Sequence, residues 1–466
     1  MSKVSIIVPT YNRARLLQIT LESVLAQTYP NIEVIVVDNA STDETPELMK
    51  HYEGRVRYIR KPVNRGMTDS YNMGWQAATG DLLMFLDSDD IIEPRMIELE
   101  VAYLAAHPEA DFVYTRFYNI DENGRRLQKV WLLPQGEAPR MLEQLVHGNF
   151  IWLGSTLFRR SRLEKVGLWD ERCSLAQDWD MFFRLALQGC RFACIQQPLG
   201  AYRHHLNNST HNVLAVEQTW LATLEKVFSH PALPENVRAL RNAAYTVTHL
   251  WMAVKHAQAR QWQGVQRQLT GAWDLNAAHP DHTRQLLKQL RNIALYLCIQ
   301  DLVGLVQGIL DHLPSRLDFL RSQSSALIGE MYLCQAMRDY DMGDFERGQA
   351  NILHALEADP SLPARRNMFI DVVTHRAVWS LAESPQAFVR IVMDKLPFEL
   401  RTLRRTQHQI LGNIDYVQAC ADFQAGRYNA VIHDVFQAVK SNPSLLRDRG
   451  LRAMFVRSAF PALQSS

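Results

Sequence analysis

Residues 83–90 read LMFLDSDD, an apolar run that ends in three acidic residues, Asp87, Asp89 and Asp90. A short apolar run of this kind is typical of a buried strand. Carboxylates this close together repel one another, and a buried charge without a partner is costly. We therefore expect the three acids either to begin a helix or to surround a positive charge.

The chain before residue 210 alternates short β-rich runs with helical patterns. The expected strands span residues 4–8, 32–38, 56–60 and 82–87, and a helical pattern follows each of them. Continuous apolar strands that alternate with helices indicate a mostly parallel sheet with helices on both faces. The Ser-x-x-Glu pattern of Ser41 and Glu44 predicts the start of the second helix, and Pro94 predicts the start of the fourth.

Polar residues stand at the carboxyl ends of all four expected strands. They are Thr10 and Tyr11 after the first strand, Asp38 in the second, residues 64–66 (Asn-Arg-Gly) after the third, and Asp87 in the fourth. In open parallel sheets, ligands bind beyond the carboxyl ends of the strands. The sequence therefore predicts one ligand site at this edge.

The acidic residues suit a hard divalent cation. Such a cation takes oxygen ligands and is often shared with the phosphates of a substrate, which fits the Asp-x-Asp spacing of Asp87 and Asp89. The alternative is that Asp89 or Asp90 caps a helix that begins near Ile92. A cap needs one carboxylate rather than three, so the alternative stays open mainly for Asp90.

Four ordered segments resemble those of an inverting family 2 glycosyltransferase with the GT-A fold. They are SIIVPTYNR (5–13), VVDNASTDET (36–45), the stretch from NRG to LMFLDSDD (64–90), and QDWDMFFRLALQG (177–189); TLFRRSRLEKVGLWDE (156–171) is similar as well. The resemblance covers residues 3–210, under half of the chain. It implies an α/β domain over residues 1–215 and the transfer of a sugar from a nucleotide-sugar, with UDP the expected nucleotide.

The resemblance also implies which residues bind the donor. Thr10, Tyr11 and Asp38 would hold the base and ribose, Arg65 would lie near the base or a phosphate, and Asp87 would approach the ribose. Many relatives carry a basic residue at the position of Tyr71. This departure makes the donor-phosphate contacts on that side uncertain.

The metal is the second implied ligand. Asp89 would bind Mg²⁺ or Mn²⁺, which stabilises the departing nucleoside diphosphate as a Lewis acid. His205, in AYRHHLNNST, matches a Tyr-Arg-x-His pattern of the family and would contact the metal or the pyrophosphate. His204 is its rival for this role.

Asp178, in AQDWD, stands where the family places its catalytic base. An inverting transfer needs a base that takes the proton of the acceptor hydroxyl, and a positioned carboxylate is sufficient. The alternative is that Asp178 or Asp180 caps the following helix. Relatives carry Glu where this chain has Gln177. The change removes a charge and predicts a lower pKa for Asp178 than in those relatives.

Information on the acceptor is sparse. The tryptophans Trp131, Trp152, Trp169 and Trp179 fall in the half of the domain that meets acceptor in the family. Aromatic faces stack on sugar rings, and we expect this of Trp179 first, although large aromatic residues are more often part of a core. The acceptor hydroxyl is expected on a saccharide, a lipid or a protein.

The chain after residue 215 is helical throughout, and three of its stretches resemble one another: 256–280, 335–360 and 418–443. In the last two, Phe345 and Tyr428 each lie 15 residues before a proline. The pattern is similar to the second half of a tetratricopeptide repeat, but the period is about 80 residues rather than 34. We expect an all-α, tetratricopeptide-like domain over residues 216–466 that binds a protein partner or a second copy.

Composition limits the remaining classes. A net charge of +1 gives no reason to expect nucleic-acid binding. Six cysteines without a CxxC pair suit a reducing compartment, and no signal peptide or membrane span stands out. We expect a cytoplasmic protein, with peripheral contact to a membrane left open.

Two other functions compete with the transferase. The first is a helical scaffold that carries a degenerate, non-catalytic transferase domain. The presence of Asp38, Asp87, Asp89 and Asp178 together argues against it, because a decayed site has no physical reason to retain clustered acids. The second, a nucleotidyltransferase, would need a glycine-rich phosphate loop after the first strand, and VPTYNRARLL has no glycine there.

Overall fold

The computed structural model of the chain describes residues 1–129, 133–137, 140–205, 212–275, 282–296, 299–424 and 427–459. The chain forms two compact units, Met1–Thr248 and His249–Ser466, which divide within helix α10 (Arg241–Gln258). The predicted domain boundary after residue 215 remains a prediction. Among the described residues, no helix is both long enough and apolar enough to cross a membrane.

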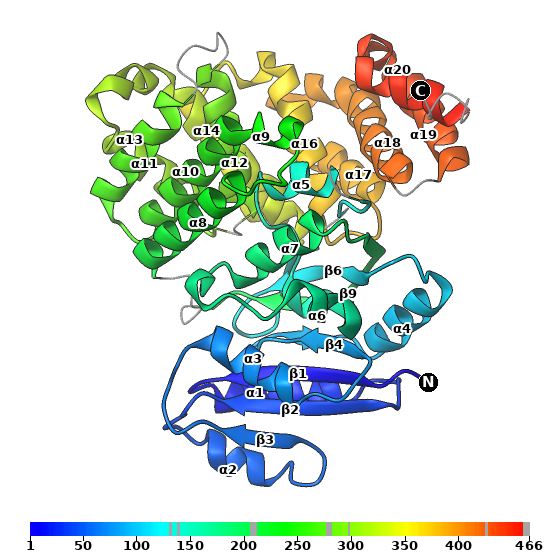
Figure 1. Ribbon diagram of the computed structural model, residues 1–466. Coiled ribbons are helices and arrows are strands. Elements are labelled where there is room, and N and C mark those ends of the chain that lie inside the picture. Colours follow the sequence, from blue (N-terminus) through cyan, green and yellow to red (C-terminus); the bar gives the residue numbers. More distant parts are fainter. Residues whose placement is uncertain are drawn as a thin grey trace. The chain divides into compact units, whose positions relative to one another are not determined.

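The first unit is built on a nine-stranded mixed sheet with the order β3-β2-β1-β4-β8-β6-β9-β5 and with β7 beside β6 (Figure 1). Its strands are β1 (Val4–Thr10), β2 (Ile32–Asp38), β3 (Arg57–Arg60), β4 (Leu82–Phe85), β5 (Ile91–Ile92), β6 (Phe112–Ile120), β7 (Arg126–Lys129), β8 (Thr156–Arg159) and β9 (Phe192–Arg203). The four predicted strands are β1 to β4, and they pair in parallel.

The other half of the sheet differs from the predicted, mostly parallel arrangement. Strand β8 runs antiparallel to both β4 and β6, while β6 and β9 pair in parallel. The mixed pairing follows from the connections, because β8 reaches the sheet after a segment that reverses the chain direction. The run of parallel neighbours β3-β2-β1-β4 therefore ends at β4, directly before the acidic cluster.

The helices of the first unit are α1 (Ala14–Leu25), α2 (Thr45–Lys50), α3 (Met67–Ala77), α4 (Met96–Ala106), α5 (Arg140–Leu145), α6 (Arg160–Val166), α7 (Gln177–Leu187), α8 (Val213–Phe228) and α9 (Glu235–Arg238). Helix α3 packs on β1 and β2 through Gly74, where a Cβ atom would lie 2.3 Å from Ile7 Cγ2. This close approach needs a residue without a side chain.

Two predicted helix starts are wrong. Helix α2 begins at Thr45, and no side chain caps it. The Ser41 hydroxyl instead accepts a hydrogen bond from the Asn12 N–H at 2.9 Å, so tertiary contacts use the group that the capping box requires. Helix α4 begins at Met96, two residues after Pro94, and residues Ile91–Ile92 form strand β5. Neither Asp89 nor Asp90 therefore caps a helix.

The helices of the second unit follow α10: α11 (Trp262–Asp274), α12 (His282–Tyr296), α13 (Leu302–Asp311), α14 (Ser324–Asp341), α15 (Phe345–Ala358), α16 (Arg366–Trp379), α17 (Pro385–Lys395), α18 (Gln407–Gln424), α19 (Tyr428–Ser441) and α20 (Arg449–Ala459). Two longer 3₁₀ segments, η4 (Ser315–Gln323) and η6 (Phe398–Thr406), lie between them.

These helices repeat with a period of 83 residues. Helix α14 spans 324–341 and α18 spans 407–424; α15 spans 345–358 and α19 spans 428–441. Segments η4 and η6 start 83 residues apart as well, at 315 and 398. Counting back by 83 from α14 gives 241–258, the bounds of α10. The predicted period of about 80 residues therefore corresponds to three units of 83.

Each predicted stretch is the end of one helix followed by a second helix that starts at an aromatic residue. The second helices begin at Trp262, Phe345 and Tyr428. Pro360 and Pro443 follow the ends of the last two, whereas Pro280 lies outside the described residues. Within a pair, a glycine allows close approach: a Cβ at Gly329 would lie 2.6 Å from Asp359 Cβ.

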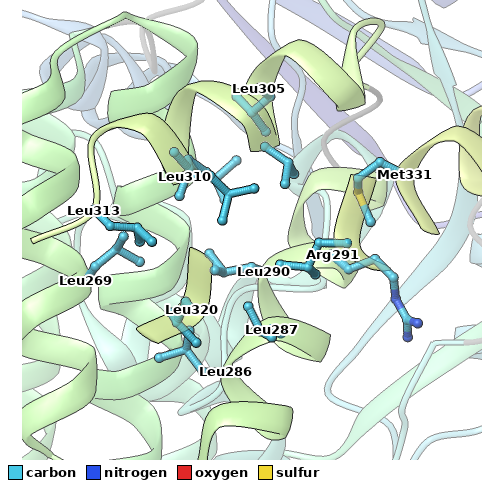
Figure 2. Close-up of a pocket in the computed structure, with 14 residues that line it drawn as sticks. Leu269, Leu286, Leu287, Leu290, Arg291, Leu305, Leu310, Leu313, Leu320 and Met331 are labelled. Atoms are coloured by element: carbon cyan, nitrogen blue, oxygen red, sulfur yellow. The ribbon is translucent and has the colours of Figure 1, made fainter. Parts of the chain in front are cut away.

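The core of the second unit is rich in leucine and includes a small pocket between α10, α11, α12, α13 and α14 (Figure 2). Leucines and Met331 line most of it, and Arg291 is the one charged residue among those labelled. The guanidinium of Arg291 points away from the leucines in the figure and pairs with Glu330. The pocket is therefore an apolar gap in the core without a polar group directed into it.

Candidate active site

The carboxyl ends of β1, β2 and β4 lie together, as predicted. Thr10 and Asp38 are partners in the β1–β2 ladder, and the Leu86 N–H donates to the Ile7 carbonyl beside them at 3.0 Å. The Thr10 hydroxyl is buried and, within the described part of the chain, has no hydrogen-bond partner. A buried hydroxyl at a strand end is available to a ligand.

Asp38 is fully buried, and its carboxylate is already bound by neighbouring residues. The Ser41 N–H donates to Oδ1 at 2.8 Å, and the Tyr58 hydroxyl donates to Oδ2 at 2.5 Å. Burial and this carboxylate raise the pKa of Tyr58, which keeps its hydroxyl a donor. Asp38 therefore fixes the loop after β2 whether or not it also binds a ligand.

Tyr11 and Arg65 are exposed at the rim of the same edge; 43% of Tyr11 is accessible to solvent. The Arg65 backbone N–H donates to Asn39 Oδ1 at 3.0 Å, and Asn39 Nδ2 donates to Asn64 at 2.6 Å. Asn39 thus joins the loop after β2 to the loop before α3. The sequence analysis did not assign it, although it lies within the quoted segment VVDNASTDET.

The acidic residues of LMFLDSDD converge as well. Each of Asp87, Asp89 and Asp90 places a carboxylate oxygen within 4.8 Å of the others. Asp90 is fully buried and accepts hydrogen bonds from Trp152 Nε1–H and the Arg203 N–H, both at 2.8 Å. It therefore holds β9 and the segment before β8 in place, and Asp87 and Asp89 are the acids left for a ligand.

Asp87 accepts a hydrogen bond from the Tyr71 hydroxyl. Burial and, after it, the charge of the neighbouring Asp89 raise the pKa of Asp87 to about 6. Tyr71 is itself fully buried and packs against Phe85 and Trp169. The residue that replaces a basic side chain of the family is thus part of the site, as a neutral donor.

Asp89 is paired with two cationic or potentially cationic groups. Its Oδ2 lies 2.6 Å from Arg13 Nη1 and 2.8 Å from His205 Nε2. The neighbouring His204 ring is 2.9 Å from Asn119 Oδ1 instead. His205 is therefore the histidine that lies beside the acids. Arg13 was not predicted, although it ends the quoted segment SIIVPTYNR.

These residues fit a divalent metal ion. Carboxylate oxygens with a neighbouring imidazole suit Mg²⁺ or Mn²⁺. The carboxylate oxygens of Asp87, Asp89 and Asp90 lie within 4.8 Å of one another, so an added positive charge would be favourable here.

Asp178 lies in the first turn of α7 and is not its cap, because the N-cap position is Ala176 and no side chain caps the helix. Asn149 Nδ2 donates to its Oδ2, and the Trp179 N–H to its Oδ1, both at 2.8 Å. Burial raises the pKa of Asp178 to about 6. That Gln177 leaves this pKa lower than in relatives that carry Glu there stays a prediction. The charge of Asp178 also raises the pKa values of Tyr71 and Asp87, so it lies near the acidic cluster.

The tryptophans are core residues. Trp152, Trp169 and Trp179 are each less than 8% exposed, and Trp131 lies outside the described residues. The indole N–H of Trp179 donates to the Leu145 carbonyl at 2.8 Å. The expected stacking of Trp179 on an acceptor sugar is therefore wrong, since the ring has no free face.

The first part of the chain is similar in sequence to glycosyltransferases. Residues 5–167 match the family model described as glycosyl transferase family 2. A relative from Rickettsia prowazekii is 32% identical over 189 residues, which are 39% of this chain and 58% of that protein. EpsJ of Bacillus subtilis is 31% identical over 221 residues, 44% of this chain and 62% of that protein. Both are described as uncharacterized glycosyltransferases, and the chain spans less than two thirds of either.

Among solved structures, TarS of S. aureus in complex with UDP-GlcNAc matches with a TM-score of 0.43 and 17% identity. The match covers 78% of this chain and 92% of that one.

Proposed function

We propose that this chain, whose first unit carries a family 2 glycosyltransferase domain of the GT-A fold, transfers a sugar from a nucleotide-sugar to an acceptor hydroxyl with inversion at the anomeric carbon. The observation that supports this most directly is the convergence of two kinds of carboxylate. Asp87 and Asp89 form an acidic cluster beside His205, and Asp178 lies nearby with its own hydrogen-bond support.

Asp178 is the proposed base. The hydrogen bonds from Asn149 and from the Trp179 N–H stabilise and orient its carboxylate, which then accepts the proton of the acceptor hydroxyl as the new glycosidic bond forms. A pKa of about 6 leaves most of the carboxylate ionised at neutral pH while keeping its basicity above that of an exposed aspartate. The proton moves to Asp178, and the nucleoside diphosphate leaves from the opposite face of the sugar.

Asp89, with Asp87 and His205, is the proposed site for Mg²⁺ or Mn²⁺. A bound dication would stabilise the negative charge that develops on the departing diphosphate. Arg13 already contacts Asp89 and is positioned to share that task with its guanidinium, which binds phosphate oxygens well.

The nucleotide is proposed to lie across the carboxyl ends of β1 and β2. Thr10 offers a buried hydroxyl, Tyr11 and Arg65 offer exposed side chains at the rim, and Asp38 shapes the loop between them. We favour UDP as the nucleotide and a cytoplasmic enzyme whose acceptor is a saccharide, a lipid or a protein. The α-helical second unit, which we interpret as tetratricopeptide-like, is proposed to bind a protein partner or a second copy.

Thermal unfolding of the full chain tests the donor site. The protein is heated with UDP, GDP or dTDP, each with and without Mn²⁺, as wild type and as Asp89→Ala. Ligand at roughly 100 times its dissociation constant adds about 2.7 kcal/mol, or on the order of 5–10 °C. We expect a shift with one nucleotide that needs metal and is lost in Asp89→Ala.

The matched control is Glu53→Ala, which changes an exposed carboxylate on the turn before β3 and should shift like wild type. Absence of a shift with every nucleotide would contradict the proposed function and favour a scaffold with a degenerate transferase domain.

A further inference from the structure

One face of helix α8 contacts the segment that contains Asp178. Three of its side chains, Trp220, Thr223 and Lys226, are spaced three residues apart and so lie on one side of the helix. All three contact residues between 170 and 180. Helix α8 lies beyond residues 5–167, the part that matches the transferase family.

Lys226 joins two acids on either side of this segment. Its Nζ lies 2.8 Å from Asp170 Oδ2 and 2.5 Å from Asp180 Oδ1. Asp180 is 1% exposed and lies two residues after Asp178 in the first turn of α7. Arg184 binds the other oxygen of Asp180 at 2.8 Å. Removing Lys226 would leave Asp170 and Asp180 close together with less compensating charge.

The other two side chains hold the same turn by packing and hydrogen bonds. The rings of Trp220 and Trp179 meet edge to face with centroids 5.7 Å apart, and the Trp220 indole N–H donates to the Leu175 carbonyl at 3.3 Å. The Thr223 hydroxyl donates to the Thr219 carbonyl at 2.9 Å and lies close enough to the buried Cys173 thiol to affect the pKa of that thiol. The contacts therefore flank Asp178 on both sides along the chain.

The 83-residue period shows that this face of α8 is exceptional. Pro231, Pro314 and Pro397 mark the same position in the three repeats, so α8, α13 and α17 are equivalent helices. At the position of Lys226, the other two repeats have Ile309 and Val392, both at most 5% exposed.

The position of Thr223 is also apolar in the other two repeats, which have Val306 and Val389 there. The first repeat departs from an apolar pattern at the two positions where its polar side chains contact the transferase domain.

We propose that Lys226 and Trp220 are positioning residues for Asp178, so that the first helix of the repeat series holds the catalytic turn of the transferase domain. The proposal rests on the proposed role of Asp178 as base. It predicts that loosening α8 impairs transfer while leaving the donor site, which is built from β1, β2 and β4, unchanged.

Two measurements on the full chain test it, with Lys226→Met as the variant and Lys50→Met as the matched control. Lys50 forms an exposed ion pair with Glu47 on α2, so replacing it should have no effect on either measurement. Hydrogen–deuterium exchange should accelerate at least severalfold over residues 175–182 in Lys226→Met, without change over β1 and β2.

Release of nucleoside diphosphate from the nucleotide-sugar should show a kcat lower by on the order of 10- to 100-fold with an unchanged KM for the donor. Lys226→Arg, which keeps the charge, should recover most of the rate.

Each outcome is decisive. Exchange equal to that of Lys50→Met would overturn the proposed contact between α8 and the catalytic turn. Faster exchange with an unaltered kcat would show that the contact is structural only, and positioning of Asp178 would be rejected.

If Lys226→Met does not fold, Trp220→Phe, which keeps the ring packing but removes the indole N–H, replaces it in both measurements. Wild-type protein without turnover on any donor would reject the proposed function, whereas the exchange result would still decide the contact.

Discussion

Asp178 and Asp87 are far apart in the sequence, but both are buried carboxyl groups with a raised pKa. Burial raises the pKa of each to about 6, and the charge of Asp178 contributes to the shift of Asp87. Asp90 belongs to the same motif as Asp87 but is bound by Trp152 and the Arg203 backbone. Of these three residues, Asp90 therefore supports the fold, and Asp87 and Asp178 are the two proposed to take part in the reaction.

Asp178→Asn should abolish most transfer while preserving donor binding. The amide keeps the shape of the carboxylate but cannot accept the hydroxyl proton, so we expect kcat to fall by roughly 10²- to 10⁴-fold. Turnover and nucleotide affinity are measured side by side, with Asp81→Asn, a change at an exposed strand end, as control. A normal kcat in Asp178→Asn would remove this residue from the mechanism.

The pH dependence of kcat should follow the ionisation of Asp178. Its pKa is raised to about 6, and only the ionised form accepts a proton. We therefore expect kcat to fall about tenfold for each pH unit below 6 and to level off above 7. A profile measured between pH 4.5 and 8 tests this, and a rate that rises toward low pH would contradict a carboxylate base.

Sequence patterns identified the residues of the site that belong to local motifs. Asp87, Asp89 and His205 come together, whereas the His204 ring lies beside Asn119; a metal contact by His205 stays a prediction. Arg13 and Asn149 escaped prediction for a physical reason: their contacts join residues 76 and 29 positions apart. Only the folded sheet brings such pairs together. The roles proposed for Thr10, Tyr11, Asp38 and Arg65 remain predictions.

Strands β1, β2 and β4 of the parallel half were predictable because they are largely apolar and buried, whereas the edge strand β3 is only partly buried. Strand β1, for example, is buried at all seven positions. Beyond residue 110 the strands mix aromatic and polar residues, and their direction depends on long connections that leave no local pattern. The capping box failed at Ser41 for a similar reason, since the Asn12 N–H takes the hydroxyl that a cap would need.

Helix pairs of the second unit depend on a glycine at the point of closest approach. A Cβ at Gly329 would meet Asp359 Cβ at 2.6 Å, and one at Gly412 would meet Asn442 Cβ at the same distance. Gly329→Ala and Gly412→Ala should therefore each destabilise the protein by about 1–3 kcal/mol through overpacking.

Chemical denaturation measures this effect, with Ser325→Ala, an exposed change on the helix of Gly329, as control. Unchanged stability in both glycine variants would show that the helix pairs adjust freely.

At the scale of the whole chain, sequence analysis identified the repeats but not their full length. Only the aromatic residue and the following proline of the second helix were visible, because the other helices vary in their surface residues. The structure adds the helices between them and extends the series back to α8, before the division at Thr248.

Two truncations test how much of the chain the transferase domain needs. Residues 1–240 retain α8, whereas residues 1–212 lack the partners of Asp170, Cys173 and Asp180 on that helix. We expect 1–240 to keep metal-dependent nucleotide binding in thermal shift measurements. The shorter chain should melt lower, by about 2–4 °C for each kcal/mol that is lost. Equal melting temperatures would show that α8 contributes nothing to the domain.

The 83-residue period also has a consequence for how the chain can change in length. A chain that lost residues 302–384 would pass from Asp301, the N-cap of α13, directly to Pro385, the first residue of α17. The junction would again place a capping aspartate before a helix with proline at its first position, an arrangement that starts helices well. Gain or loss of one whole 83-residue repeat, here called a module, would thus leave every helix boundary intact. Relatives of this chain are expected to differ in length by multiples of one module, with α8 and the contacts around Asp178 kept in each.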